Sequence, residues 1–177
     1  MKVVLDSLPP EGRAVTGALD DEWLFDAARR AVEAKPRALS ATLRVRKDTD
    51  ARFRVTGELS ARWRTSCDRC VRQLMVTLDG PVDLLYQRGT APQDDEVDLG
   101  ADDLDIGWIN GGSIDLADVV SEQLTLWLPD RTLCEDAHTT RTDTADVGPC
   151  AVPHHDGGPD LQKKSPFSAL ANWKPPH

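Results

Sequence analysis

Residues 52–78, RFRVTGELSARWRTSCDRCVRQLMVTL, contain two strand-like runs that meet at a Cys-x-x-Cys motif. In the first run apolar side chains alternate with arginines, a period of two that is typical of a half-buried β-strand. The apolar positions then change from odd to even numbers, because the first run ends with Trp63 and the second resumes at Leu74. A regular strand cannot change parity, so the chain must turn or bulge between residues 66 and 71. The two cysteines of the motif therefore mark a corner.

Residues 39–46 alternate in the same way, and a Lys-Asp-Thr-Asp turn connects them to residues 52–78, so we expect an antiparallel hairpin. Side by side, the even positions of these runs place arginines on one face of a sheet, and the odd positions place apolar side chains on the other. Because arginine binds phosphate bidentately and stacks on bases, this face is a candidate RNA-binding surface. A solvated face, or arginines paired with acids elsewhere in the chain, is the competing interpretation. The arginine face comprises Arg44, Arg46, Arg52, Arg54, Arg62 and Arg64, and Arg69 and Arg72 at the corner join it as candidate RNA-binding residues.

The charge of the chain is divided between two regions. The formal net charge of -9 argues against nonspecific nucleic-acid binding by the whole molecule. Residues 37–72, however, hold ten Lys/Arg against four Asp/Glu, whereas residues 75–136 hold two against fifteen. The acidic half can neutralise the arginine face or contact a basic partner, and residues 94–96 and 102–103 are its densest acidic clusters.

Two segments have the periodicity of helices that bury one side. The first covers residues 23–34 and ends before Pro36; the second covers residues 115–128, with Asp115 as its N-cap and Pro129 after its end. The sequence predicts further strands over residues 2–6, 13–19 and 82–87, and a short apolar run covers residues 104–109. We expect Gly80-Pro81 to break the strand before residue 82. We therefore expect an α+β fold: a curved, mostly antiparallel sheet or partly open barrel with two packed helices and an irregular C-terminal tail.

The length of 177 residues suits one domain with a tail. We expect an α+β core over residues 1–133 and an irregular tail over residues 134–177 that docks on the core through Phe167, Leu170 and Trp173. No run of about 18 apolar residues and no secretory signal pattern occurs, so the expected compartment is the cytoplasm, without a membrane partner.

The four cysteines, Cys67, Cys70, Cys134 and Cys150, are candidate metal ligands rather than a disulfide framework, because the cytosol keeps thiols reduced. A structural zinc site needs four ligands, commonly from two close pairs, and Cys67 with Cys70 is one such pair. Cys134 and Cys150 are too far apart in sequence to form a second knuckle by themselves, although histidines such as His138, His154 or His155 can substitute. Structural zinc and plain thiols both remain open, and the spacing favours plain thiols.

The chain resembles the YceD family, the large ribosomal RNA subunit accumulation proteins. Three segments carry the resemblance: Gly57-Glu58-Leu59 leading to Cys67-Asp68-Arg69-Cys70, residues 114–122 leading to Leu128-Pro129 and Leu133-Cys134, and a closing segment over residues 165–170. Many relatives have a further cysteine knuckle in the tail, of which only Cys134 and Gly148-Pro149-Cys150 remain here. The resemblance implies a non-enzymatic role in producing or stabilising large-subunit (23S) ribosomal RNA, with that RNA, a pre-ribosomal particle or ribosomal proteins as partners.

The sequence contains no Gly-rich phosphate loop, no Gly-x-Ser-x-Gly elbow and no His-Glu-x-x-His motif, so we do not expect an enzyme. The expected function is a ribosome-biogenesis factor that binds large-subunit RNA through the arginine face. An acidic protein-binding adaptor in ribosome assembly and a small zinc-stabilised module are the alternatives.

Overall fold

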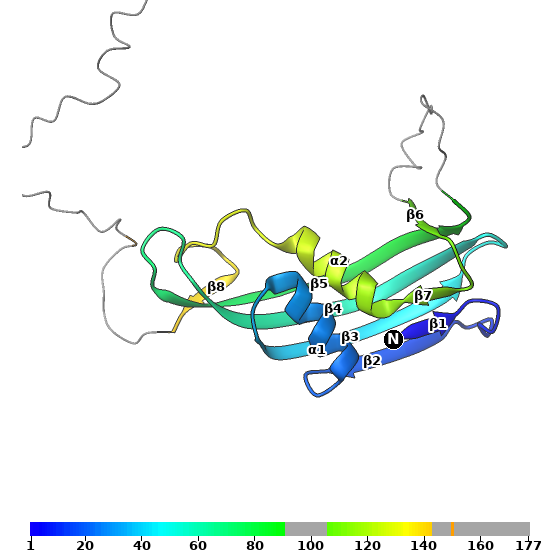
Figure 1. Cartoon of the computed structure of the whole chain (residues 1–177), viewed down its shortest axis with the longest axis horizontal. Coiled ribbons are helices and arrows are strands. Elements are labelled where there is room, and N and C mark those ends of the chain that lie inside the picture. The colour runs from blue at the N-terminus through cyan, green and yellow to red at the C-terminus, as the bar shows by residue number, and fades with distance from the viewer. Residues whose placement is uncertain (91–105, 143–149, 151–177) are drawn as a thin grey trace, which may run out of the picture.

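The computed structural model describes residues 1–90, 106–142 and 150. Within them the chain forms a six-stranded sheet with two helices on one face and a separate two-stranded sheet nearby (Figure 1). The larger sheet has the order β2-β3-β4-β5-β6, and β8 pairs with another part of β5. The expected α+β fold with a curved, mostly antiparallel sheet is confirmed, and the sheet does not close into a barrel.

Long antiparallel strands form the centre of this sheet. They are β2 (Arg13–Ala18), β3 (Pro36–Lys47), β4 (Arg52–Ser66) and β5 (Gln73–Arg88). The hairpin expected from the alternation is β3–β4, with Val45 paired to Val55, and the corner expected at the cysteines joins β4 to β5, with Ser66 paired to Gln73. The parity change in the sequence therefore corresponds to a real turn.

The expected break at Gly80-Pro81 is wrong, because β5 continues through it, with Pro81 paired to Glu58. Two short strands share the outer edge of β5: β8 (Thr139–Arg141) pairs antiparallel with residues 74–76, and β6 (Ile106–Ile109) pairs parallel with residues 85–88. Between them, at Pro81, no other strand of the described chain pairs with this edge of β5. A proline, which lacks a backbone N–H, is tolerated there and discourages pairing with another chain.

The helices are α1 (Glu22–Val32) and α2 (Leu116–Trp127), close to the expected ranges. Asp115 caps α2 as expected, since its side chain accepts a hydrogen bond from the N–H of Ala117 at 3.0 Å. The small sheet pairs β1 (Lys2–Val4) with β7 (Ser113–Asp115), which leads directly into α2.

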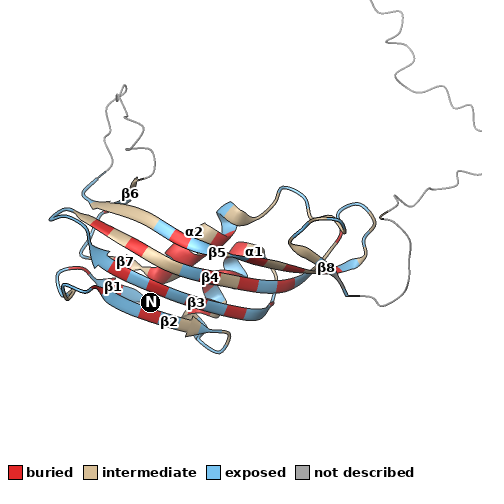
Figure 2. Ribbon diagram, turned by 180° about the vertical axis from the view of Figure 1, so that it is seen from behind, coloured by how far each residue is buried: buried red, intermediate tan, exposed pale blue. Residues whose placement is uncertain are grey.

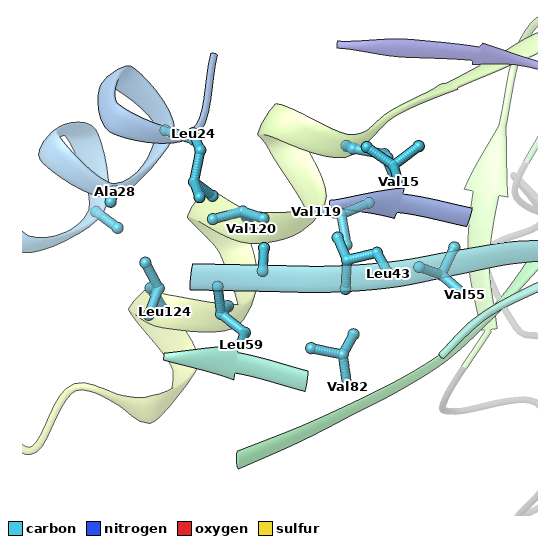
Figure 3. Close-up of a cluster of buried hydrophobic side chains, with 14 of the residues drawn as sticks. Val15, Leu24, Ala28, Leu43, Val55, Leu59, Val82, Val119, Val120 and Leu124 are labelled. Atoms are coloured by element: carbon cyan, nitrogen blue, oxygen red, sulfur yellow. The ribbon is translucent and has the colours of Figure 1, made fainter. Parts of the chain in front are cut away.

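The core lies between the helices and one face of the large sheet. Leu24, Ala28, Val120 and Leu124 of the helices point toward Leu43 and Leu59 of the strands (Figure 3), and all six side chains are buried. Along β4 buried and more exposed residues alternate, so the more exposed residues share the opposite face of the sheet. No helix of the described chain covers that face (Figure 2). The strands thus leave one broad sheet face open to solvent.

Candidate metal centre and arginine face

The corner between β4 and β5 presents Cys67 and Cys70 from a tight turn. The N–H of Cys67 donates to the carbonyl of Arg72 at 2.8 Å, and the N–H of Val71 donates to the carbonyl of Cys67 at 2.9 Å. Val71 has a φ of 63°, in the left-handed region, which reverses the chain direction. Only 1% of Cys67 is exposed. The turn therefore fixes both sulfurs on the inner side of the corner.

A second chain segment is bonded to this corner just before Cys134. Asp68 and Thr132 bond reciprocally: the N–H of Asp68 donates to the carbonyl of Thr132 at 2.9 Å, and the N–H of Thr132 donates to the Asp68 carboxylate at 2.6 Å. Arg69 also donates to the carboxylate of Glu135 at 2.7 Å. These contacts place Cys134 opposite the Cys-x-x-Cys turn.

The segment after Cys134 returns along β5. The Asp136 carboxylate accepts a hydrogen bond from the N–H of Leu133 at 2.6 Å, which tightens the turn around Cys134. The carbonyl of His138 accepts from the N–H of Thr77 at 2.9 Å, and β8 follows directly. A short strand therefore forms within a segment whose sequence shows no periodicity.

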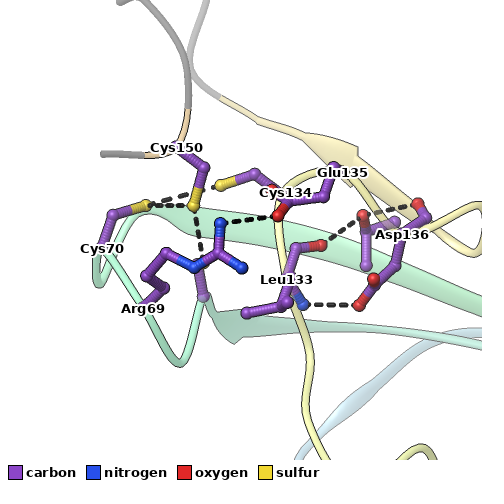
Figure 4. Close-up of polar contacts among 9 residues, drawn as sticks. Arg69, Cys70, Leu133, Cys134, Glu135, Asp136 and Cys150 are labelled. Atoms are coloured by element: carbon purple, nitrogen blue, oxygen red, sulfur yellow. Dashed lines mark hydrogen bonds and ion pairs between the residues drawn. The ribbon is translucent and has the colours of Figure 1, made fainter. Parts of the chain in front are cut away.

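The four cysteine sulfurs converge at this point, although the sequence separates Cys134 from Cys150 by fifteen residues (Figure 4). The Sγ–Sγ distances are 3.5 Å for Cys67–Cys150, 3.5 Å for Cys70–Cys134 and 3.6 Å for Cys70–Cys150. All four sulfurs lie within 4.8 Å of one another. The cysteines are free thiols, and their separations far exceed the sulfur–sulfur bond of about 2.05 Å in a disulfide. Four thiols in this arrangement can bind a metal ion.

The ionisation of these thiols is strongly unequal. Burial opposes ionisation of Cys67, but hydrogen bonds from the backbone N–H groups of Cys70 and Arg69 and from the thiols of Cys150 and Cys70 outweigh it, and lower its pKa to about 6. Burial, together with its cysteine neighbours, raises the pKa of Cys134 to about 12 and also raises that of Cys150. The cluster therefore holds one thiolate readily, whereas full ionisation requires positive charge among the sulfurs, which a coordinated cation supplies.

The arginine face divides into two groups along the sheet. The register pairs Arg46 with Arg54 across β3 and β4, and Arg44 and Arg52 lie beside them. Arg62 and Arg64 lie at the other end of β4, near the cysteines. Eight residues of extended strand separate Arg54 from Arg62, about 27 Å at the usual rise per residue. The six arginines share one face but not one site.

Acidic and polar groups engage much of the first group. Arg54 donates Nε and one terminal nitrogen to the two carboxylate oxygens of Asp83, at 2.6 and 2.8 Å. Arg44 donates to the carbonyl of Glu11 at 3.0 Å, and Arg52 donates to the side chain of Gln87 at 3.2 Å. The competing interpretation from the sequence, pairing with acids of the second half, therefore describes Arg54.

The second group differs, because Arg62 and Arg64 are exposed and make no ion pair within the described residues. At the corner, Arg69 is paired with Glu135. Arg72 is half-buried, and its backbone carbonyl accepts a hydrogen bond from the N–H of Cys67.

The sequence pointed to all these arginines but missed Asp68, Thr132 and Glu135, which hold the two cysteine-bearing segments together. Their only signal in the sequence is their closeness to Cys67, Cys70 and Cys134.

Several expected features lie outside the described residues. These are the acidic clusters at 94–96 and 102–103, His154, His155, and the docking residues Phe167, Leu170 and Trp173. His138 is described; its Nε2 is buried, has no hydrogen-bond partner among the described residues, and lies 3.9 Å from the Asp136 carboxylate. His138 is not among the residues that cluster with the cysteines.

Comparison with models of known protein families gives a match. A sequence model of the YceD family, described as large ribosomal RNA subunit accumulation protein YceD, matches residues 55–174. Neither a curated protein nor a solved structure matches the chain. In the described part of the chain no helix is both long and apolar enough to cross a membrane. Because the match covers more than half of the 177 residues and includes all four clustered cysteines, the chain belongs to the YceD family of large ribosomal RNA subunit accumulation proteins.

Proposed function

We propose that this protein promotes accumulation of large-subunit (23S) ribosomal RNA in the cytoplasm by binding the RNA, or a pre-ribosomal particle that contains it, without catalysing a reaction. The description of the family names accumulation of this RNA and no reaction. Binding would protect and position the RNA. Ribosomal proteins that assemble on the same RNA are further candidate partners.

The observation that carries this proposal is the helix-free face of the sheet, which presents a row of arginines on β3 and β4. Its opposite face is filled by the core, so the strands hold the arginine stems at fixed spacing. Guanidinium groups suit phosphate because their planar arrangement of donors matches two phosphate oxygens. A rigid array of this kind binds an extended polyanion without needing a pocket.

RNA crosslinking in cells tests this function. The natural protein is compared with a variant that carries Arg52→Glu, Arg54→Glu, Arg62→Glu and Arg64→Glu, and the recovered RNA is sequenced. We expect the variant to recover much less large-subunit RNA. Equal recovery from both proteins would contradict binding through the arginine face and would favour an acidic adaptor, which reaches the particle through protein contacts of acidic residues such as Asp118 and Glu122 on α2.

We also propose that Cys67, Cys70, Cys134 and Cys150 bind one structural zinc ion. A tetrahedral zinc–thiolate site with Zn–S bonds near 2.3 Å places its sulfurs about 3.8 Å apart. The separations of 3.5 and 3.6 Å are close to this value, and four cysteines are a donor set typical of structural zinc sites. All four positions are filled by cysteines, which leaves no open position for a substrate and supports a structural role.

Elemental analysis of the purified protein tests the zinc proposal. We expect close to one equivalent of zinc per chain, and close to none after substitution of Cys70 and Cys134 by serine. A natural protein that contains no zinc, and whose thiols all react with a thiol reagent while the chain stays folded, would contradict it.

A further inference from the structure

A β-bulge at the start of β3 places a further arginine on the arginine face. Pro36 pairs with Trp63 and Ala38 pairs with Arg62, so Arg37 is the extra residue between two consecutive pairs. In a regular strand Arg37 would share the buried face of Leu39. The bulge instead leaves both Arg37 and Ala38 exposed while Pro36 stays buried. Bulges commonly redirect a side chain in this way.

Arg37 therefore joins Arg62 and Arg64 at the cysteine end of the sheet. Arg62 lies beside Ala38 and Thr77, and Arg64 lies beside Met75, which is itself paired with Thr140 of β8. None of these directly paired neighbours is acidic. Asp79, an acid of the same sheet face, pairs with Ser60 and forms no ion pair among the described residues. Arg37, Arg62 and Arg64 are all exposed, and no ion pair involves them in the parts of the chain that the structure describes. We call these three residues the free arginine cluster.

The other end of the arginine face offers less available charge. The two carboxylate oxygens of Asp83 bind Nε and one terminal nitrogen of Arg54, which form one bidentate edge of the guanidinium, and the charge of Arg46 also acts on Asp83. Asp48 and Asp50 lie in the turn between β3 and β4, where Asp50 pairs with Lys47 at 2.8 Å. A phosphate approaching there would have to displace Asp83 from Arg54 and overcome repulsion from three carboxylates.

We propose that the free arginine cluster, Arg37, Arg62 and Arg64, is the surface that binds the RNA backbone, and that the Arg44–Arg54 end of the sheet contributes little. This inference rests on the proposed function and narrows the site from the whole arginine face to one end of it. Arg62 and Arg64 are two residues apart on one strand face, about 6.6 Å, and Arg37 extends the cluster onto β3. The partner is a phosphate backbone, recognised by charge and guanidinium geometry, with no base readout implied by these contacts.

The position of the cluster links it to the cysteine site. Arg64 is near the end of β4, two residues before Ser66 and three before Cys67. The adjoining strand β8 belongs to the segment between Cys134 and Cys150. A metal bound by the four cysteines would therefore connect the end of β4, which carries Arg62 and Arg64, to the segment that contains β8 on the far side of β5.

The test measures binding of the purified full-length chain to a transcript of large-subunit ribosomal RNA over a series of salt concentrations. One variant carries R37E, R62E and R64E, and the matched control carries R44E, R46E and R52E, so that both change the net charge by the same amount. A neutral variant, R62Q and R64Q, guards against misfolding caused by three reversals, and circular dichroism checks each protein. Each lost phosphate contact should lower the slope of log K against log salt by about 0.7 to 0.9.

We expect the cluster variant to lose most of the affinity and about two to three units of salt slope, and the neutral variant to lose a smaller share. The control should lose clearly less affinity than the cluster variant. If the control loses as much affinity as the cluster variant, or more, the location is wrong while direct RNA binding stands. If the natural protein does not bind the transcript, direct RNA binding itself fails, and this surface fails with it.

Discussion

Arg54 and Asp83 form a two-bonded ion pair across β4 and β5, with nitrogen–oxygen distances of 2.6 and 2.8 Å. The pair lies on the helix-free face, where both side chains are partly exposed. Exposed ion pairs contribute little to stability. The main consequence of this pair is therefore that Arg54 is occupied by Asp83 and is less available to bind phosphate. One acidic residue thus decides how much of the arginine face is available.

Substitution Asp83→Asn should release Arg54 and make the Arg44–Arg54 end more attractive to RNA. We expect tighter binding at low salt and a salt slope steeper by up to about 0.9, the value for one added phosphate contact. The titration is the same as for the arginine variants. Substitution of Asp20, an exposed acid in the turn between β2 and α1 that makes no ion pair among the described residues, by asparagine is the matched control, and it should change the slope less.

The same pair predicts a pH dependence of stability. The hydrogen bond from Arg54 lowers the pKa of Asp83 below its ordinary value of 3.8. The contribution of the pair to the free energy of unfolding is therefore complete above pH 3.8. It is lost as the pH falls through the pKa of Asp83 in the folded protein, which lies below 3.8. The difference in thermal midpoint between the natural protein and Asp83→Asn should stay constant from about pH 8 to about pH 5 and shrink only below about pH 4. A difference in thermal midpoint that already shrinks near neutral pH would mean that the ionisation of a group other than Asp83 sets the pH dependence.

Much of this fold could be predicted from local patterns. The alternation in residues 52–66 identified β4 and its buried side, and the parity change alone located the Cys67–Cys70 corner. Asp115 and Pro129 predicted the ends of α2 to within about a turn. These signals work because each depends on residues that are close in sequence and share one strand or helix.

The features that the sequence did not predict have a common physical cause: each depends on contacts between chain segments that are far apart in sequence. A proline interrupts a strand that is paired on both sides, but Pro81 lies where β5 is paired only with β4 among the described residues, and the sequence does not show this. The meeting of Cys134 with Cys150 depends on the contacts of Asp68 and Arg69 with another segment, which have no periodicity. The bulge that exposes Arg37 appears only when β3 and β4 are aligned.

Arg69 should act through the cysteine site rather than as an RNA contact, because Glu135 occupies it at 2.7 Å. We expect Arg69→Glu to speed the loss of zinc to a chelator, since repulsion from Glu135 separates the two cysteine-bearing segments. The exchanged variant, Arg69→Glu with Glu135→Arg, should restore slow release. RNA affinity of the exchanged variant should match that of the natural protein; a large loss there would make Arg69 a direct RNA contact.

Gly57 on β4 should tolerate no side chain. Its φ is 156°, and an added Cβ would collide with the carbonyl oxygen of Thr42 on β3. We expect Gly57→Ala to lower the free energy of unfolding by at least about 2 kcal/mol, because the backbone of two central strands must separate. Gly111 has no neighbour within 4 Å of the position that a Cβ would take, so Gly111→Ala is the control and should change stability by less than about 0.5 kcal/mol. Urea denaturation measures both.

Loss of one cysteine should loosen a defined part of the molecule and leave the core intact. In Cys134→Ser the four-thiol site is incomplete, so the segment around Cys134 should detach from the β4–β5 corner. The N–H groups of Asp68 and Thr77 report this directly, because they donate to the carbonyl groups of Thr132 and His138 of that segment.

We expect the hydrogen exchange of these two N–H groups to accelerate in Cys134→Ser. The natural protein treated with a chelator should show the same pattern. Amides of the β3–β4 pair around Val45 and Val55 should be unchanged, since both side chains are fully buried in the core and lie toward the β3–β4 turn, away from the cysteines. Acceleration spread evenly over the sheet would instead mean that the cysteines support the whole fold, and unchanged exchange at Asp68 and Thr77 would mean that the metal does not hold this segment.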